Sequence, residues 1–207
     1  MDKGLLLEKL SKKIDDCRRC DLWKNTTHAV PGEGNPDAKV MFIGEGPGFH
    51  EDRVGRPFVG QSGKLLDKMI EKVSLTRSDV FIGNVVKHRA PENRDPSSLE
   101  ISACNYWLDQ QLEIINPKVV VTLGRFSLAK FMPTAKISQV HGDPVRVRNY
   151  VVIPMYHPAA ALRRGAILRL LEEDFLRNKE ILFDPESFDM SKLGPKSEDS
   201  DQMSFFN

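Results

Sequence analysis

Side chains that can do chemistry cluster around the ends of short apolar runs in this sequence. Glu45 and Gly46 follow the first run, and Phe58 lies in a second glycine-containing stretch soon after it. Asn84 lies near the end of the second run, and His157 ends the fourth. Because ligands bind at the carboxyl ends of strands in open α/β sheets, these groups are expected to converge on one crevice. An acid, an amide, an aromatic ring and an imidazole in one crevice favour an active site over isolated core residues or solvated loop acids.

The glycines at residues 44–48 do not fit a nucleotide-binding loop. They lie at every second position, whereas the dinucleotide fingerprint is G-x-G-x-x-G, and Pro47 lacks the N–H that would bind phosphate. The sequence also has no P-loop lysine. A nucleotide cofactor is therefore disfavoured, and a structural turn would explain the glycines equally well.

The three cysteines form a second group of reactive residues. Cys17 and Cys20 follow the first predicted helix with a two-residue spacing, and Cys104 lies on the apolar face of a later helix. A thioredoxin-type pair would follow a strand, so a redox role is disfavoured. With His88 as the best-placed imidazole, the set can supply four ligands to a metal or an iron–sulfur cluster. Free buried thiols and a structural zinc remain alternatives.

Four β-branched runs must position these groups, and they lie at residues 39–45, 79–86, 118–124 and 151–157. The runs are nearly continuous in apolar residues, which is typical of strands covered on both faces in a parallel sheet. Helical periodicity appears at residues 5–16, 63–74, 97–115, 125–132 and 159–183. This alternation predicts a three-layer α/β/α fold with a central four-stranded, mainly parallel sheet.

The length and composition limit the class of protein. The chain has 207 residues with 30 Lys+Arg and 29 Asp+Glu, which suits one domain. No run approaches the roughly 18 apolar residues of a membrane span, the first residues do not read as a secretory signal, and the few scattered cysteines favour a reducing compartment. We therefore expect a cytoplasmic protein with no membrane partner.

The chain divides into a domain at residues 1–183 and a tail at residues 184–207. The tail holds six acidic residues and two lysines and shows almost no periodicity, so we expect it to be disordered. The remaining residues carry a net charge of +5, which is compatible with a phosphate-binding face without establishing one.

Three sequence blocks, at residues 44–69, 84–96 and 155–164, together resemble the family 4 uracil-DNA glycosylases, which are iron–sulfur enzymes. The cysteine pair in residues 17–23 and its spacing to Cys104 are similar to that family as well. The resemblance spans residues 5–183 and is specific as a set of blocks. It implies a monomeric DNA repair enzyme that flips uracil out of DNA and hydrolyses its N-glycosidic bond, leaving an abasic site.

The resemblance also implies roles for individual residues around the flipped base. Phe58 would stack on uracil, Asn84 would pair with its polar edge, and Glu51 would crowd a 5-methyl group and so exclude thymine. His157 would donate a hydrogen bond to uracil O2, and Glu45 would orient a water or stabilise positive charge on the sugar.

Two further parts of the site follow from the same resemblance. Backbone N–H groups near Gly46 would assist the pocket. Leu162 and Arg163 would form the wedge that fills the gap left in the duplex.

The sequence departs from the family at His88, where the family usually has cysteine. A sister group that traps DNA covalently carries histidine there, but it also has an inserted basic loop that residues 89–95 do not contain. We therefore expect turnover, and a [4Fe–4S] cluster held by Cys17, Cys20, Cys104 and His88.

The end of the tail resembles a second known motif, the short peptide by which bacterial replication proteins bind the sliding clamp. Gln202, Met203, Phe205 and Phe206 would supply its anchors, with the preceding tail as a tether. Such short motifs also arise by chance.

Other functions compete with uracil excision. The same fold could serve as a non-catalytic or covalent-trapping DNA-binding protein, or remove another deaminated base such as hypoxanthine or xanthine. A metal-dependent small-molecule hydrolase would need more ligands than the crevice supplies.

Overall fold

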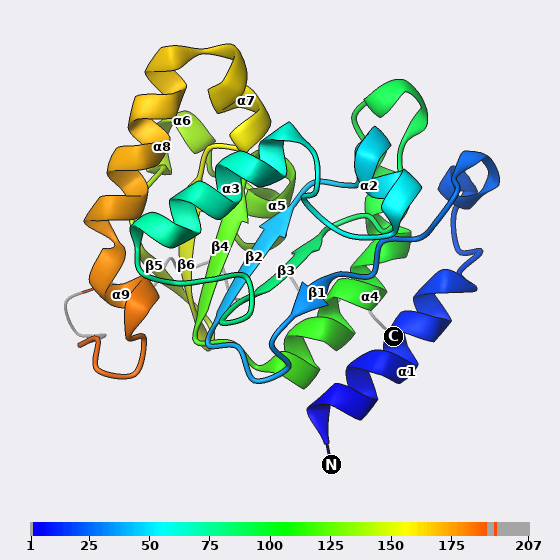
Figure 1. The fold of residues 1–207 in the computed structure, drawn as a ribbon, viewed down its shortest axis with the longest axis horizontal. Helices are drawn as coiled ribbons and strands as arrows, with labels where there is room; N and C mark the ends of the chain where they lie inside the picture. The colour runs from blue at the N-terminus through cyan, green and yellow to red at the C-terminus, as the bar shows by residue number, and fades with distance from the viewer. Residues whose placement is uncertain (1, 190–192, 194–207) are drawn as a thin grey trace.

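A mixed six-stranded sheet forms the centre of the computed structural model, which describes residues 2–189 and 193 (Figure 1). The sheet order is β1-β3-β2-β4-β6-β5. The strands are β1 (Glu33–Gly34), β2 (Val40–Gly44), β3 (Phe81–Asn84), β4 (Val119–Leu123), β5 (Val145–Val147) and β6 (Tyr150–Met155). The four central strands are parallel, and β1 and β5 pair antiparallel at the two edges.

The predicted three-layer fold and its four parallel strands are confirmed, but the predicted strand count was too low. The two additional strands are only two and three residues long. Both lie at an edge with partly exposed side chains, so neither produces the continuous apolar run by which the buried strands were found.

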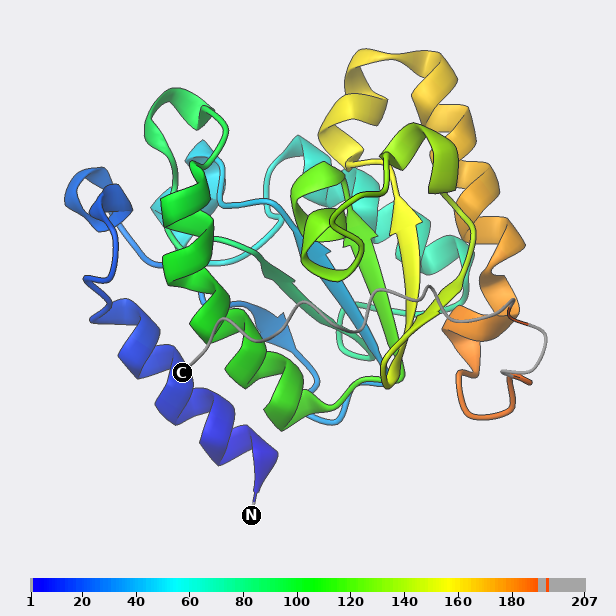
Figure 2. The same cartoon turned by 180° about the vertical axis from the view of Figure 1, so that it is seen from behind.

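Helices cover both faces of the sheet, as the two views in Figures 1 and 2 show. The helical elements are α1 (Lys3–Asp15), η1 (Asp21–Asn25), α2 (Phe49–Val54), α3 (Gln61–Lys72), η2 (Pro91–Asn93), α4 (Ser98–Ile115), α5 (Arg125–Phe131), α6 (Ile137–Val140), α7 (Pro158–Arg163), α8 (Gly165–Arg177) and α9 (Lys179–Phe183).

Alternate residues of β2 enter two separate cores because a strand points successive side chains to opposite faces. Phe42 packs with side chains of α3, α8 and α9, and its ring stacks on that of Phe175. Met41 and Ile43 pack on the other face, against α4. The outer helix α1 then packs on α4 through a smaller cluster that includes Ile14 and Trp107. Packing on both faces therefore holds the strands in place and fixes the positions of their carboxyl ends.

The single long helix predicted at residues 159–183 is wrong, because the chain there forms α7, α8 and α9. Arg164 is extended, with φ −142° and ψ 109°, and it separates α7 from α8. Asn178 separates α8 from α9, and its buried side-chain amide donates to the carbonyl oxygens of Gly142 (2.9 Å) and Asp174 (2.8 Å). The first break lets α7 turn away from α8 at the end of β6.

The first residues after α9 contact the body of the domain. Glu186 pairs with Lys39 at 3.1 Å, and Phe188 and Leu193 pack against the core that contains Phe42. The predicted clamp-binding residues, 202–206, lie outside the described residues. Among the helices of the described residues, none combines the length and apolarity needed to cross a bilayer.

Candidate active site

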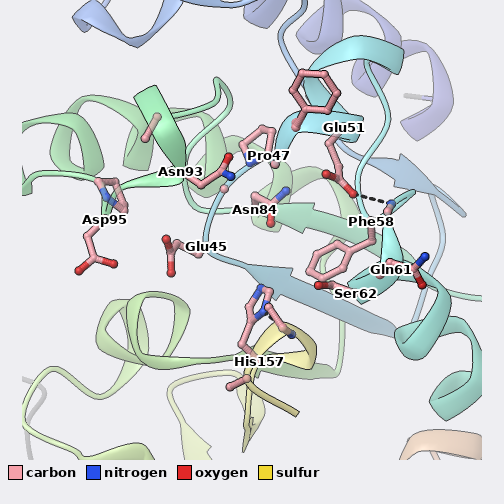
Figure 3. Close-up of a pocket in the computed structure, with 18 of the residues that line it drawn as sticks. Glu45, Pro47, Glu51, Phe58, Gln61, Ser62, Asn84, Asn93, Asp95 and His157 are labelled. Atoms are coloured by element: carbon pink, nitrogen blue, oxygen red, sulfur yellow. Dashed lines mark hydrogen bonds between the residues drawn. The ribbon is translucent and has the colours of Figure 1, made fainter. Parts of the chain in front are cut away.

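A cavity of about 750 Å³ lies at the carboxyl ends of the central strands and brings together the side chains that the sequence predicted there. Glu45, Phe58, Asn84 and His157 all line it. Figure 3 shows Glu45 and Phe58 on opposite sides of this space, with Asn84 and His157 between them. The four groups come from three different strand ends and one loop, so the parallel sheet is what makes them neighbours.

Phe58 forms one wall of the cavity and is held in an unusual backbone conformation. Its φ is +53°, its side chain is buried, and its ring lies 5.7 Å from the His157 ring at an interplanar angle of 28°. Arg77 fixes this turn by donating to the carbonyl oxygens of Pro57 (2.6 Å) and Phe58 (3.0 Å). A Cβ on Gly63 would lie 1.7 Å from the Phe58 carbonyl oxygen, so only glycine fits there.

Asn84 offers an unpaired polar atom to the cavity. The residue is only 1% exposed, and its Oδ1 is among the few buried side-chain atoms of the described residues without a hydrogen-bond partner. Its backbone carbonyl accepts from the buried Lys87 ammonium at 2.7 Å, and Lys87 also donates to Gln111 at 2.7 Å. A buried acceptor without a partner costs free energy, so this amide is suited to a ligand that donates a hydrogen bond.

His157 caps the N-terminus of α7 and thereby fixes its own tautomer. Its Nδ1 accepts the backbone N–H of Ala159 at 3.1 Å. Burial lowers the pKa of His157 to about 4, so the imidazole is neutral at pH 7. Because Nδ1 is the acceptor, the single ring proton lies on Nε2, where it can be donated to a bound group.

Glu45 lies partly buried on the opposite side of the cavity from Phe58. Burial raises the pKa of its carboxyl group, the nearby Asp95 carboxylate raises it further, and the Arg125 guanidinium opposes both effects. Asp95 and Arg125 also line the cavity and pair with each other. Glu45 is therefore an acid whose charge is sensitive to this neighbouring pair.

Glu51 lines the same cavity and has a structural role that the sequence did not reveal. Its Oε1 accepts the backbone N–H groups of Val59 (2.9 Å) and Gly60 (2.8 Å), and Figure 3 shows a dashed line at this carboxylate. Glu51 thus ties α2 to the turn that carries Phe58. The pattern of apolar residues in the sequence gives no sign of such a hydrogen bond between a side chain and the backbone of another segment.

Of the other predicted residues, Gly46 and Arg163 line the cavity, and Leu162 precedes Arg163 on α7 without being among the lining residues. A Cβ on Gly46 would lie 2.6 Å from Val86 Cγ2, which also lines the cavity, so a larger residue at this position would clash with the cavity wall. The Leu162 side chain is half exposed.

The three cysteines are not among the residues that line the cavity: Cys20 and Cys104 share one apolar cluster, and Cys17 lies in another with Trp107. Cys17 and Cys104 are buried and Cys20 is half-buried. The thiols of Cys20 and Cys104 form a hydrogen bond with each other. Trp107 Nε1 donates to Cys17 Sγ at 3.1 Å, and the backbone N–H of Lys87 donates to Cys104. His88, the next residue, is also buried.

Thiols that receive N–H groups have the chemistry of iron–sulfur ligands, so these residues are compatible with such a cluster. No three His, Cys, Asp or Glu side chains in the described part of the chain are close enough to hold one ion. N–H groups directed at the ligand sulfurs are typical of iron–sulfur sites. The N–H groups of Trp107 and Lys87 meet that requirement.

Comparisons with known proteins agree with this architecture. The model of the uracil DNA glycosylase superfamily matches residues 31–176. A Type-4 uracil-DNA glycosylase of Sulfurisphaera tokodaii is 44% identical over 95% of this chain and 94% of its own length. One from Thermotoga maritima is 42% identical over 86% of this chain and 95% of its own length. A Type-5 uracil-DNA glycosylase of Pyrobaculum aerophilum is 31% identical over 70% of this chain and 72% of its own length. The chain therefore belongs to the uracil-DNA glycosylase superfamily, and within it to the Type-4 enzymes.

Proposed function

We propose that this glycosylase extrudes uracil from DNA into the cavity between Glu45 and Phe58 and hydrolyses its N-glycosidic bond, leaving an abasic site. One observation supports this most strongly, namely the meeting of an aromatic wall, an unpaired amide, a neutral imidazole and an acid in one cavity. A base inside a duplex cannot be reached by such groups, so it must leave the stack.

Phe58 and Asn84 are suited to select uracil. The Phe58 ring provides a flat apolar surface on which a pyrimidine stacks. The unpaired Oδ1 of Asn84 can accept uracil N3–H, while its amide N–H donates to O4. Cytosine has no proton on N3 and has an amine in place of O4, so it would leave the amide unpaired on both sides. Such a mismatch typically disfavours a ligand strongly.

Glu51 and Gly46 would complete the pocket around the base. The Oε1 of Glu51 is already occupied by the turn that carries Phe58. We propose that the rest of this carboxylate lies against C5 of uracil and excludes a 5-methyl group. The absence of a side chain at Gly46 would leave room for backbone N–H groups at the edge of the base.

His157 and Glu45 would act on the bond that breaks. As the bond lengthens, negative charge moves onto uracil O2, and the Nε2–H of neutral His157 would donate to it. Positive charge develops on the sugar at the same time. An ionised Glu45 would stabilise that charge or orient the attacking water.

Leu162 and Arg163 would occupy the gap left by the extruded nucleotide. A half-exposed leucine at the end of a short helix beside the cavity is an apolar wedge of the kind that separates base steps. Arg163 at the cavity wall would place a cation near the flanking phosphates.

A direct assay tests this function. An oligonucleotide with one uracil should be converted to an alkali-labile abasic product, whereas matched oligonucleotides with cytosine or thymine should stay intact. Protein and DNA should separate fully on a denaturing gel, because we expect turnover and no covalent adduct. Cleavage of hypoxanthine or xanthine substrates in preference to uracil, or a DNA-linked protein band, would contradict the proposal.

We further propose that Cys17, Cys20, Cys104 and His88 hold a [4Fe–4S] cluster. When bound, the cluster would supply a rigid cross-link between α1, α4 and the loop after β3, since base hydrolysis includes no redox step. The burial of His88 next to Lys87, whose N–H reaches Cys104, supports an imidazole as the fourth ligand.

Metal analysis of anaerobically purified protein tests the ligand set. The wild-type protein should contain iron and sulfide, His88→Ala should lose most of both, and His88→Cys should retain them. Cys20→Ser is the matched ligand variant and should lose iron as His88→Ala does. Absence of both elements from the wild type rejects the cluster, and full iron content in His88→Ala rejects His88 as its ligand.

Two proposals from the sequence rest on observations of the sequence alone. Clamp binding depends on Gln202, Met203, Phe205 and Phe206, and a monomeric state depends on the resemblance to family 4 enzymes. Both stay proposals.

A further inference from the structure

Phe49 is an exposed aromatic residue at the rim of the active-site cavity, and the roles described above make no use of it. It begins α2, lines the cavity and is 50% exposed. Exposing half of a phenylalanine forgoes much of the free energy that its burial would contribute. A solvent-facing ring beside a substrate cavity is therefore a candidate for contact with the substrate itself.

Two cations flank the Phe49 ring. The guanidinium carbon of Arg89 lies 5.3 Å from the ring centroid and that of Arg53 lies 5.9 Å from it. Arg53 lies on α2 and Arg89 lies in the loop after β3, so two different segments each bring a guanidinium group over the ring. An aromatic surface with positive charges close to it is the combination that binds single-stranded nucleic acid, with bases stacked on the ring and phosphates paired with the cations.

The position of Phe49 determines which base it can reach. Glu51, two residues further along α2, lines the cavity that would receive the extruded uracil. A strand that delivers one base into this cavity must carry its neighbour across the rim. The half-exposed Leu162 lies on α7 and Phe49 lies on α2, so Phe49 and the proposed wedge do not compete for one position.

We propose that Phe49 is a stacking platform for a base adjacent to the extruded uracil on the same strand, with Arg53 and Arg89 contacting the flanking phosphates. This inference rests on the proposed uracil excision. The contribution of Phe49 to substrate affinity should be greatest on single-stranded DNA, because there the neighbouring base need not leave a duplex in order to stack on the ring.

The test pairs a protein variant with a substrate variant. Wild type, Phe49→Ala and Phe49→Trp are compared on single-stranded oligonucleotides that carry uracil between two normal bases, or with the base omitted on the 5′ or the 3′ side. Because stacking on an aromatic side chain contributes substantially to the binding of each base of a single strand, Phe49→Ala should lower kcat/KM about tenfold on the complete substrate. Omission of the stacked base should lower the wild-type value similarly and should leave Phe49→Ala unchanged. Phe49→Trp should keep the dependence on the neighbouring base.

Phe183→Ala is the matched control. Phe183 is a similarly exposed phenylalanine, at 57%, and it lies on α9 at the opposite end of the molecule from α2 in both views (Figures 1 and 2). Its replacement should leave kcat/KM unchanged on every substrate.

The outcomes separate this inference from the proposed function. If the wild-type protein excised uracil from none of the substrates, the proposed function itself would be wrong. Normal wild-type excision with an unchanged kcat/KM in Phe49→Ala would overturn the platform. An equal loss in Phe49→Ala on all three substrates would show that Phe49 only supports the fold, and would overturn it as well.

Arg53 provides an independent measure of the same contact. Each phosphate contact on a single strand contributes about 0.7 to the slope of log K against log salt. Arg53→Gln should therefore weaken binding of a single-stranded oligonucleotide and reduce that slope by about this amount. An unchanged slope would exclude Arg53 from the phosphate contact.

Discussion

Replacement of His157 by alanine is expected to lower the rate of uracil excision by about 10²–10³, the usual effect of losing one donor to a developing negative charge. The imidazole is neutral at pH 7 because burial lowers its pKa to about 4. Its proton lies on Nε2 because Nδ1 accepts the N–H of Ala159. Single-turnover excision from a uracil-containing oligonucleotide measures the loss.

A second variant separates this chemistry from folding. His157 is also the N-cap of α7, so the alanine variant should lose about 1 kcal/mol of stability through the cap. Asparagine is a favoured N-cap residue and can accept the Ala159 N–H, but it presents no donor where Nε2 lies. His157→Asn should therefore melt near the wild-type temperature while its rate falls as far as that of His157→Ala. Excision at the wild-type rate in either variant would remove His157 from the mechanism.

The depressed pKa of His157 also has a consequence for stability. In the unfolded chain the imidazole titrates near its ordinary value of 6.5, so between pH 6.5 and about pH 4 the unfolded state binds the proton more readily. Stability should therefore fall as the pH drops through this window, and His157→Asn should remove that part of the fall.

The central sheet and the contents of the cavity were predictable because their signals are local. The strands β2, β3, β4 and β6 are buried along almost their whole length, so the runs that contain them are nearly continuous in apolar residues. Once the strands are parallel, their carboxyl ends lie together, and the polar residues that follow them become neighbours.

Features that depend on contacts between distant segments were not predictable in the same way. The break between α8 and α9 depends on the Asn178 amide, which reaches the carbonyl oxygen of Gly142, 36 residues away in sequence. The turn at Phe58 is fixed by Arg77, 19 residues away. The hydrogen bonds that Glu51 accepts from the backbone of this turn also join residues that are not neighbours in sequence. Helical periodicity at residues 159–183 continues across such breaks, because it reports which side of the chain is apolar and not where a side chain interrupts the backbone hydrogen bonds.

Replacement of Glu45 by glutamine is expected to lower kcat by about 10²–10⁴, the range that a positioned acid or base contributes. Glutamine keeps the shape of the side chain and removes the charge, so the loss measures the carboxylate itself. Rates for both proteins should be followed from pH 4 to pH 8 under single-turnover conditions.

The pH profile identifies the group responsible. Burial and the Asp95 carboxylate raise the pKa of Glu45, so the wild-type rate should fall on the acid side at a pH above the ordinary glutamate value. His157 loses its neutral form only near pH 4, which leaves Glu45 to determine this limb. Glu45→Gln should lack the limb. Asp95→Asn is the matched control, because it removes one carboxylate and frees Arg125, and both effects should move the limb to lower pH.

A third variant decides between the two roles of the carboxylate. Glu45→Asp keeps the charge and withdraws it by one methylene group. Stabilisation of charge on the sugar weakens gradually with distance, so in that case Glu45→Asp should retain most of the activity that Glu45→Gln loses. Orientation of a water requires a hydrogen bond of defined length, so in that case Glu45→Asp should fall nearly as far as Glu45→Gln. A Glu45→Gln variant with the wild-type rate and an intact acid limb would exclude both roles, and the hydrolysis would then depend on His157 and the pocket alone.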